Sequence, residues 1–198
     1  MDIRPLDRET YAGRRFTARY RTRGYYDIRG CEGGFRMDYV PFGTPVERSF
    51  DDSFFGEWLE RPVALGAFEG QELVGFAEGS VESWNRRFRI SNICVFDGAQ
   101  RGRGVGSLLM DAIQQEAAAS GVRMIVLETQ SCNEHAIAFY KRHGFAVIGF
   151  DLYAYTNEDP ERHEVRVEMG KMLGRRWGFA PPLLTFSDAP LTFSENMV

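Results

Sequence analysis

The sequence predicts a single α/β domain with a mixed, mostly antiparallel sheet and helices packed on it. Three observations carry this prediction. Residues 63–82 form an apolar hairpin pattern, helical stripes begin at 105 and 133, and a nearly continuous apolar run lies between them at 122–128. Because strands precede, separate and follow the helices, the predicted order is β-α-β-β-β-α-β-α-β-β, which indicates one layered domain.

The N-terminal third is expected to be less regular. Residues 2–6 alternate polar and apolar side chains as a short strand would, and the arginine-rich stretch 8–24 favours a helix. From 25 to 61 neither period is kept, and aromatic and acidic side chains crowd the segment. A long irregular segment in a compact domain is more often a binding loop than a spacer. We therefore expect a lid over a site, whose aromatics either hold a ligand or form core beneath the lid.

The remaining elements come in a regular order. A turn at 69–71 joins the two strands of the hairpin, and 88–96 predicts the next strand. The apolar stripe of the following helix is Val105, Leu108, Leu109, Ala112 and Ile113. Asn133 caps a second helix that Gly144 ends. The last two strands are expected at 145–155 and 163–173.

The C-terminal segment 174–198 differs from the predicted domain, which spans 1–173. It contains three prolines and repeats a short pattern as LTFSD and LTFSE. We expect an extended tail that lies on the domain or on a partner subunit, which leaves a homodimer open.

Composition excludes several classes of function. The formal net charge of the 198 residues is −4, which favours neither nucleic acid nor an anionic membrane surface as a partner. No apolar run is long enough to span a bilayer, and the first ten residues lack the apolar core of an export signal. We therefore expect a cytoplasmic protein. The three cysteines and three histidines lack metal-ligand spacing, so neither a disulfide framework nor a metal site is expected.

The stretch QRGRGVGSLL at 100–109 lies between a predicted strand and a predicted helix. Glycines there let backbone N–H groups approach a ligand, and the first turn of a helix offers unpaired donors with partial positive charge. This combination predicts an anion site suited to phosphate, to which Arg101 and Arg103 add charge. The patterns of a P-loop and of a Rossmann loop are both absent. A basic nucleic-acid patch, and glycines that serve only to start the helix, stay open from these residues alone.

Two motifs in succession resemble the GNAT family of N-acetyltransferases. The R/Q-x-x-G-x-G/A pattern is matched by Arg101, Gly104 and Gly106. The N-x-x-A-x-x-F-Y-x-x-x-G-F pattern is matched by Asn133, Ala136, Phe139, Tyr140, Gly144 and Phe145. The resemblance covers residues 3–173 and implies the GNAT fold. Within this family the chain is similar to streptothricin acetyltransferases at WNR (84–86), LETQ (127–130) and GFD (149–151).

This resemblance implies acetyl-CoA as the donor and a primary amine as the acceptor. It places the pyrophosphate on the backbone amides of Arg101, Gly102, Arg103, Gly104, Val105, Gly106 and Ser107. It places the pantetheine arm along Ile93, Cys94 and Val95, where that strand and the strand from Val122 splay apart. It further implies cofactor contacts at Asn133, Phe139 and Tyr140.

The chemistry needs a neutral amine, donors for the oxyanion and a proton for the leaving thiolate. The resemblance assigns the proton donor to Tyr140, whose phenol stays protonated at neutral pH, with a core tyrosine as the alternative. The base is open, because streptothricin acetyltransferases typically carry adjacent acids where this chain has Ser91 and Asn92. Asn92 or Ser91 could position a water instead. Carboxylate candidates for the base are Glu128, Glu78 and Glu82.

The sequence therefore predicts an acetyl-CoA-dependent N-acetyltransferase for a small cationic amine, with a streptothricin-type antibiotic as one candidate acceptor. The segment 25–61 suits such a cation, because acids attract it and aromatic faces hold an ammonium. Two alternatives stay open: an acetyltransferase for a protein or peptide amine, and a non-catalytic acyl-CoA-binding module.

Overall fold

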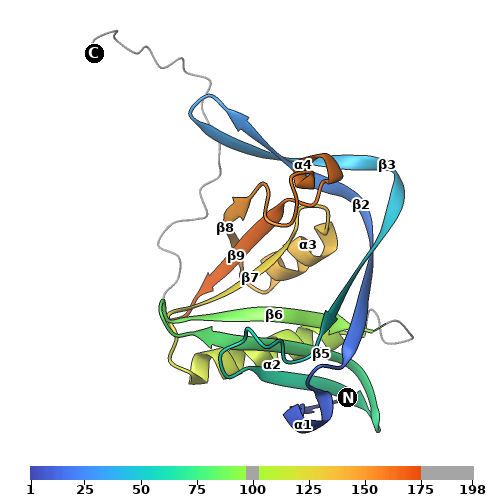
Figure 1. Ribbon diagram of the computed structural model, residues 1–198, viewed down its shortest axis with the longest axis vertical. Helices are drawn as coiled ribbons and strands as arrows, with labels where there is room; N and C mark the ends of the chain where they lie inside the picture. Colours follow the sequence, from blue (N-terminus) through green and yellow to red (C-terminus); the bar gives the residue numbers. More distant parts are fainter. Residues whose placement is uncertain (97–102, 175–198) are drawn as a thin grey trace.

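A computed structural model of the chain describes residues 1–96 and 103–174 (Figure 1). Its elements are β1 (Asp2–Pro5), α1 (Arg8–Tyr11), β2 (Arg15–Cys31), β3 (Gly34–Ser53), β4 (Val63–Glu69), β5 (Glu72–Glu82), β6 (Arg87–Val95), α2 (Val105–Ala119), β7 (Met124–Gln130), α3 (Glu134–Arg142), β8 (Ala146–Asp151), α4 (Asp159–Arg162) and β9 (Arg166–Met172). Seven strands form one sheet in the order β1-β4-β5-β6-β7-β9-β8, and β2 and β3 form a separate two-stranded sheet.

The large sheet has the predicted mixed character. β6 and β7 run parallel, whereas its other neighbouring strands run antiparallel. α2 lies in the crossover from β6 to β7 and packs on β4, β5 and β6. This architecture confirms the predicted mixed, mostly antiparallel sheet with flanking helices.

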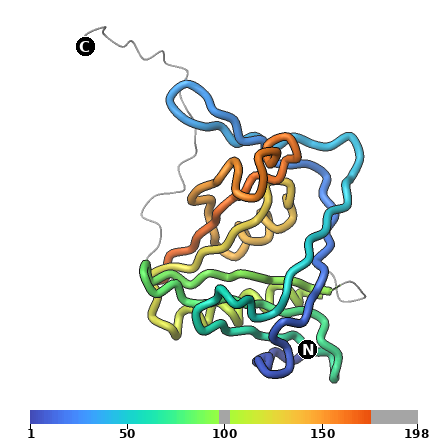
Figure 2. Tube along the Cα trace, viewed as in Figure 1, coloured from blue at the N-terminus to red at the C-terminus, as the bar shows by residue number. Residues whose placement is uncertain are grey.

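The large sheet opens between its two central strands. β6 and β7 pair from Arg87↔Met124 to Ile90↔Leu127. Beyond this point they diverge, so that the two halves of the sheet form a V (Figure 1). The hairpin of β2 and β3 crosses the open side of this V, from the end near α1 to the end near α4 (Figure 2).

A helix was predicted for residues 8–24 and irregular chain for 25–61, and both predictions were wrong. Helix α1 is only four residues long, and the long antiparallel hairpin of β2 and β3 occupies most of the chain between α1 and β4. Buried and exposed residues alternate along β2, as expected for a strand. Some of the buried residues are small or polar, so the sequence shows no clear alternation of apolar and polar side chains. The buried positions of its first half are Phe16, Ala18 and Thr22, whereas the arginines at 15, 19 and 21 are exposed.

An aromatic cluster attaches the hairpin to the sheet. The rings of Phe16 and Phe54, from the base of the hairpin, contact the ring of Phe76 in β5 with centroids 4.9 and 4.3 Å apart. All three side chains are buried. Part of the aromatic segment predicted as a lid is therefore core, and offset or edge-on ring packing of this kind adds to the apolar burial.

Helix α2 buries one stripe against the sheet. Four of its buried residues are spaced four apart along the helix, namely Val105, Leu109, Ile113 and Ala117, and Met110 is buried beside them. Leu108, predicted for this stripe, is 45% exposed, and Met110 occupies the buried position instead. The short helix α4 was not predicted from the sequence.

Two predicted features lie outside the described residues. These are the segment 97–102, which begins the glycine loop, and 175–198, which is nearly all of the predicted tail. Within the described part of the chain, each helix is too short or too polar to cross a membrane.

Candidate active site

A bulge in β6 sets the shape of the site. Gly79 of β5 lies opposite Ile90 and Glu78 lies opposite Asn92, so Ser91 is the extra residue in β6. The pairing of β6 with β7 ends at the same place, at Ile90. From there the two strand edges face each other across a gap that an extended ligand can enter.

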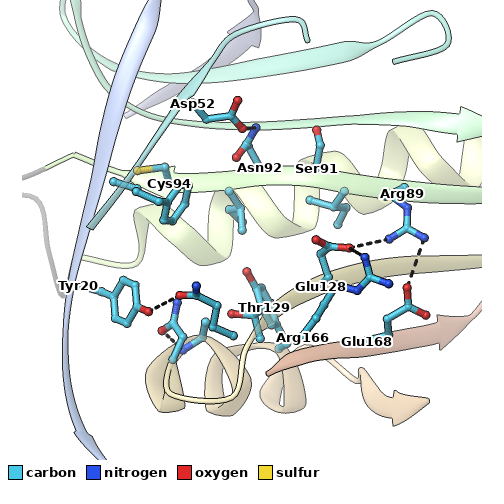
Figure 3. A pocket seen from close by; sticks show the side chains of 18 of the residues that line it. Tyr20, Asp52, Arg89, Ser91, Asn92, Cys94, Glu128, Thr129, Arg166 and Glu168 are labelled. Carbon is cyan, nitrogen blue, oxygen red and sulfur yellow. Dashed lines mark hydrogen bonds and ion pairs between the residues drawn. The ribbon is translucent and has the colours of Figure 1, made fainter. Parts of the chain in front are cut away.

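A cavity of about 770 Å³ occupies this opening (Figure 3). β6 and β7 line its sides, α3 contributes Tyr140, and the hairpin closes it with Tyr20, Phe50 and Asp52. The cavity brings together many of the residues predicted for the site, namely Asn92, Ile93, Cys94, Val95, Glu128, Asn133 and Tyr140.

Tyr140 presents a phenol to this cavity from an otherwise buried position. Its side chain is 8% exposed, and its hydroxyl has no hydrogen-bond partner within residues 1–96 and 103–174. Burial raises the pKa of the Tyr140 phenol well above its usual value, and the neighbouring Cys94 raises it further. The group is therefore protonated at neutral pH and has a proton to donate.

A cluster of two carboxylates and one amide lies at the bulge. The Asn92 side-chain amide donates to the Asp52 carboxylate at 3.0 Å and to the Glu78 carboxylate at 3.4 Å. Glu78 is fully buried and accepts a hydrogen bond from the backbone N–H of Phe55 at 2.6 Å. Asp52 was not singled out from the sequence. Its position in β3, forty residues before Asn92, gives no local signal of the contact.

Glu128 is brought to the site but is held by arginines. Its carboxylate lies 3.5 Å from the Arg89 guanidinium and 3.8 Å from that of Arg166. Burial, together with the Glu128 carboxylate, raises the pKa of the Tyr155 phenol nearby. In these contacts the Glu128 carboxylate balances the charge of the two arginines in the cavity wall. Its action as a base stays a prediction. Glu82 is bound by Arg89 and Asn85 in the same way.

The N-terminus of α2 lies where the sequence predicted an anion site, and the site itself stays a prediction. Gly104 precedes the helix with a left-handed φ of +82° and has no side chain that could cap it. The backbone N–H groups of 105–107 in the first turn therefore have no side-chain cap as a hydrogen-bond partner. The Ser107 hydroxyl lies 3.2 Å from His143 Nε2. Arg103 reaches Glu69 at 3.2 Å. Arg101 and Gly102 lie outside the described residues.

Asn133 and Phe139 hold helix α3 in different ways. Asn133 caps the helix, as predicted, by accepting the backbone N–H of Ala136 at 3.2 Å, and its side chain also lines the cavity. Phe139 does not line the cavity. Its ring lies against Gly106 of α2 and against His143, with the latter centroids 4.6 Å apart. Phe139 thus fixes the spacing of α2 and α3.

Residues 33–145, more than half of the chain, match the acetyltransferase (GNAT) family. The chain belongs to this family. Streptothricin acetyltransferase of Streptomyces lavendulae is 30% identical over 80% of this chain and 86% of its own length. Streptothricin acetyltransferase of Escherichia coli is 35% identical over 72% of this chain and 79% of its own. The crystal structure of nourseothricin acetyltransferase, at 26% identity, has a TM-score of 0.70 over 86% of this chain and 97% of that one.

The predicted family, fold and enzyme class are therefore confirmed. This GNAT protein is an N-acetyltransferase. Its described residues contain no group of three or more His, Cys, Asp or Glu side chains placed to hold a metal ion. The side chains that line the cavity are the candidates for its proton transfers.

The buried Glu78 carboxylate gives a pH-dependent stability that can be measured. Burial raises the pKa of Glu78 above its usual value of 4.5, so its contribution to folding is full below pH 4.5 and is lost as pH rises toward the folded-state pKa. Glu78→Gln removes this titration. We expect the unfolding free energy of the wild type to fall, relative to that of the variant, as pH rises from 4.5.

Urea unfolding of both proteins across this pH range measures the effect. A difference in unfolding free energy that stays constant with pH would contradict it.

Proposed function

We propose that this acetyltransferase transfers the acetyl group of acetyl-CoA to a primary amine of a small cationic molecule of the streptothricin type. The observation that carries the proposal is a group of three carboxylates in the cavity wall, Asp52, Glu128 and Glu168. Glu128 and Glu168 share two arginines of the wall, Arg89 and Arg166, with Glu82 and Asp151, which lie outside the lining. Arg19 is the third arginine of the wall.

Further features of the cavity suit an ammonium. Asp52 lines the cavity and, among the described residues, forms no ion pair. Tyr20, Phe50, Trp58 and Tyr155 provide aromatic faces, and such faces attract a cation. Because the hairpin roofs the opening, a compact acceptor fits better than a folded protein surface. The two curated relatives named streptothricin acetyltransferase agree with this choice.

The donor fits the other side of the same opening. We place the pyrophosphate at the amides that begin α2, including those of 105–107, because a helix N-terminus with unpaired N–H groups binds anions. The pantetheine arm lies along 93–95 of β6, where β7 has diverged. This path brings the thioester toward Tyr140 and Asn92, which both line the cavity. We place the reaction in the cytoplasm, where acetyl-CoA is available and cysteines such as the three here stay reduced.

Acceptor competition tests the proposed acceptor. We expect kcat/KM for streptothricin to exceed that for a neutral-bodied primary amine of similar size by about tenfold or more, since one charge-assisted contact contributes about 1.5 kcal/mol. Initial rates of CoA release with each acceptor give the ratio.

Peptides with a free N-terminus serve as the comparison class in that experiment. Peptides acetylated as efficiently as streptothricin would contradict the small-molecule assignment. Tight acetyl-CoA binding without transfer to any amine would instead identify a non-catalytic acyl-CoA-binding module.

A further inference from the structure

The bulge of β6 offers no carboxylate of its own to the acceptor amine. The two residues there are Ser91 and Asn92, neither of which takes up a proton near neutral pH. An alkyl amine is an ammonium at neutral pH and must lose a proton before it can attack the thioester. A proton acceptor must therefore reach this point from another element. This inference rests on the proposed acetyl transfer to an amine.

The hairpin brings one carboxylate to the bulge. Asp52 lies opposite Phe16 in the pairing of β3 with β2, and residues directly opposite in an antiparallel pair point to the same face. The ring of Phe16 is buried in the aromatic cluster on β5. Asp52 therefore faces the sheet, and Figure 3 shows its carboxylate directed at Asn92. Its neighbour Asp51 points to the opposite face and is bonded there to Thr17.

The hydrogen bonds of Asp52 leave it able to bind a further donor. One oxygen accepts the Asn92 amide at 3.0 Å and the other accepts the backbone N–H of Ser53 at 2.8 Å. A carboxylate has about four acceptor positions, so each oxygen keeps a lone pair. The side chain lines the cavity and forms no ion pair with a described residue. Asp52 is thus an oriented hydrogen-bond acceptor at the wall of the site.

Glu78 cannot take this place. It is fully buried, it is not part of the cavity lining, and its oxygens are directed at Phe55 N–H and Asn92. Its carboxylate shares the Asn92 amide with Asp52, which fixes the amide nitrogen toward both acids. Glu78 and Asn92 therefore act as positioning residues behind Asp52.

We propose that Asp52 accepts the proton of the amine in this enzyme. The hairpin brings Asp52 to the site, and Asn92 orients its carboxylate. The ammonium of the acceptor gives one proton to the Asp52 carboxylate, which passes it to solvent. The neutral nitrogen then forms the C–N bond at the thioester carbon, and collapse of the tetrahedral adduct breaks the C–S bond. Tyr140 gives its proton to the leaving thiolate. The second nitrogen proton leaves through Asp52 to solvent, and solvent restores the phenol.

The test is Asp52→Asn measured against acceptor amines of graded basicity. For strongly basic amines we expect kcat/KM to fall by about 10²-fold or more, because general-base catalysis contributes a factor of that order. For weakly basic amines, which are already neutral at the assay pH, we expect a loss below about tenfold. The KM for acetyl-CoA should not change.

Two further variants make the result decisive. Asp51→Asn, on the outer face of the same strand, should retain wild-type rates with every amine. Asp52→Glu, which keeps a carboxylate, should retain more activity than Asp52→Asn. An equal loss for weakly and strongly basic amines, or wild-type rates in Asp52→Asn, would overturn the assignment. Thermal unfolding of each variant shows whether a loss comes from misfolding.

The outcome is separate from that of the proposed acceptor. Simple amines in the series report on Asp52 whether or not streptothricin is acetylated. A wild-type enzyme that acetylates simple amines but not streptothricin would overturn the proposed acceptor, while the Asp52 comparison would still be decided. A wild-type enzyme that acetylates no amine would overturn both.

Discussion

Replacing Tyr140 by phenylalanine is expected to lower kcat by roughly 10²- to 10⁴-fold, the usual contribution of a positioned proton donor. The ring is packed between α3 and the sheet, so removal of one oxygen leaves its packing with Phe139 and Phe145 in place. The hydroxyl has no hydrogen-bond partner in the described part of the chain, so its loss leaves no protein group unsatisfied. The effect should therefore fall on turnover and not on folding.

Steady-state kinetics with acetyl-CoA as the varied substrate distinguish these effects. We expect the KM for acetyl-CoA and the unfolding temperature of Tyr140→Phe to stay near their wild-type values. Tyr153→Phe provides a matched control, because Tyr153 is 59% exposed and does not line the cavity. A kcat within twofold of wild type in both variants would remove Tyr140 from the mechanism.

Replacing Gly79 by alanine is expected to damage both stability and activity. A Cβ at this position would lie 2.5 Å from the backbone oxygen of Arg89 and 2.5 Å from the Phe88 ring. Because a backbone atom is the obstacle, β6 must shift, at a cost of about 1–3 kcal/mol. Gly79 lies opposite Ile90, next to the bulge that displays Asn92. A displacement of about 1 Å there is expected to lower kcat/KM by up to about 10²-fold.

Urea unfolding and initial rates measure the two consequences. Gly149→Ala is the control, because a Cβ at Gly149 meets no atom within 4 Å. We expect Gly149→Ala to resemble wild type in both measurements. If Gly79→Ala also resembled wild type, the spacing of β5 and β6 would not control the site.

The sequence predicted the elements from residue 63 onward, apart from α4, because their signals are local. The hairpin turn, the stripe of α2 and the Asn133 cap each depend on residues within a few positions of one another. The motif residues Tyr140 and Asn133 both line the cavity, and their roles stay predictions. Leu108 is exposed, because the buried face of α2 includes Met110 and not Leu108.

The hairpin and its carboxylate could not be found in the same way. Ala18 and Thr22 occupy buried positions in β2 where an apolar pattern would show larger side chains, so the alternation was hidden. Asp52 meets Asn92 only because Phe16 and Phe54 anchor the hairpin to β5. That contact depends on tertiary packing over forty residues of sequence. The sequence offered glutamates as candidate bases, whereas the base that we propose, Asp52, comes from the hairpin.

A single-turnover experiment tests acetyl transfer in this cavity most directly. Acetyl-CoA labelled in its acetyl group is mixed with excess enzyme and streptothricin, and the label is followed in both compounds. We predict that the label leaves acetyl-CoA and appears in an amide of the antibiotic at the same rate. A folded enzyme that binds acetyl-CoA but leaves the label on the thioester in the presence of streptothricin would contradict the account.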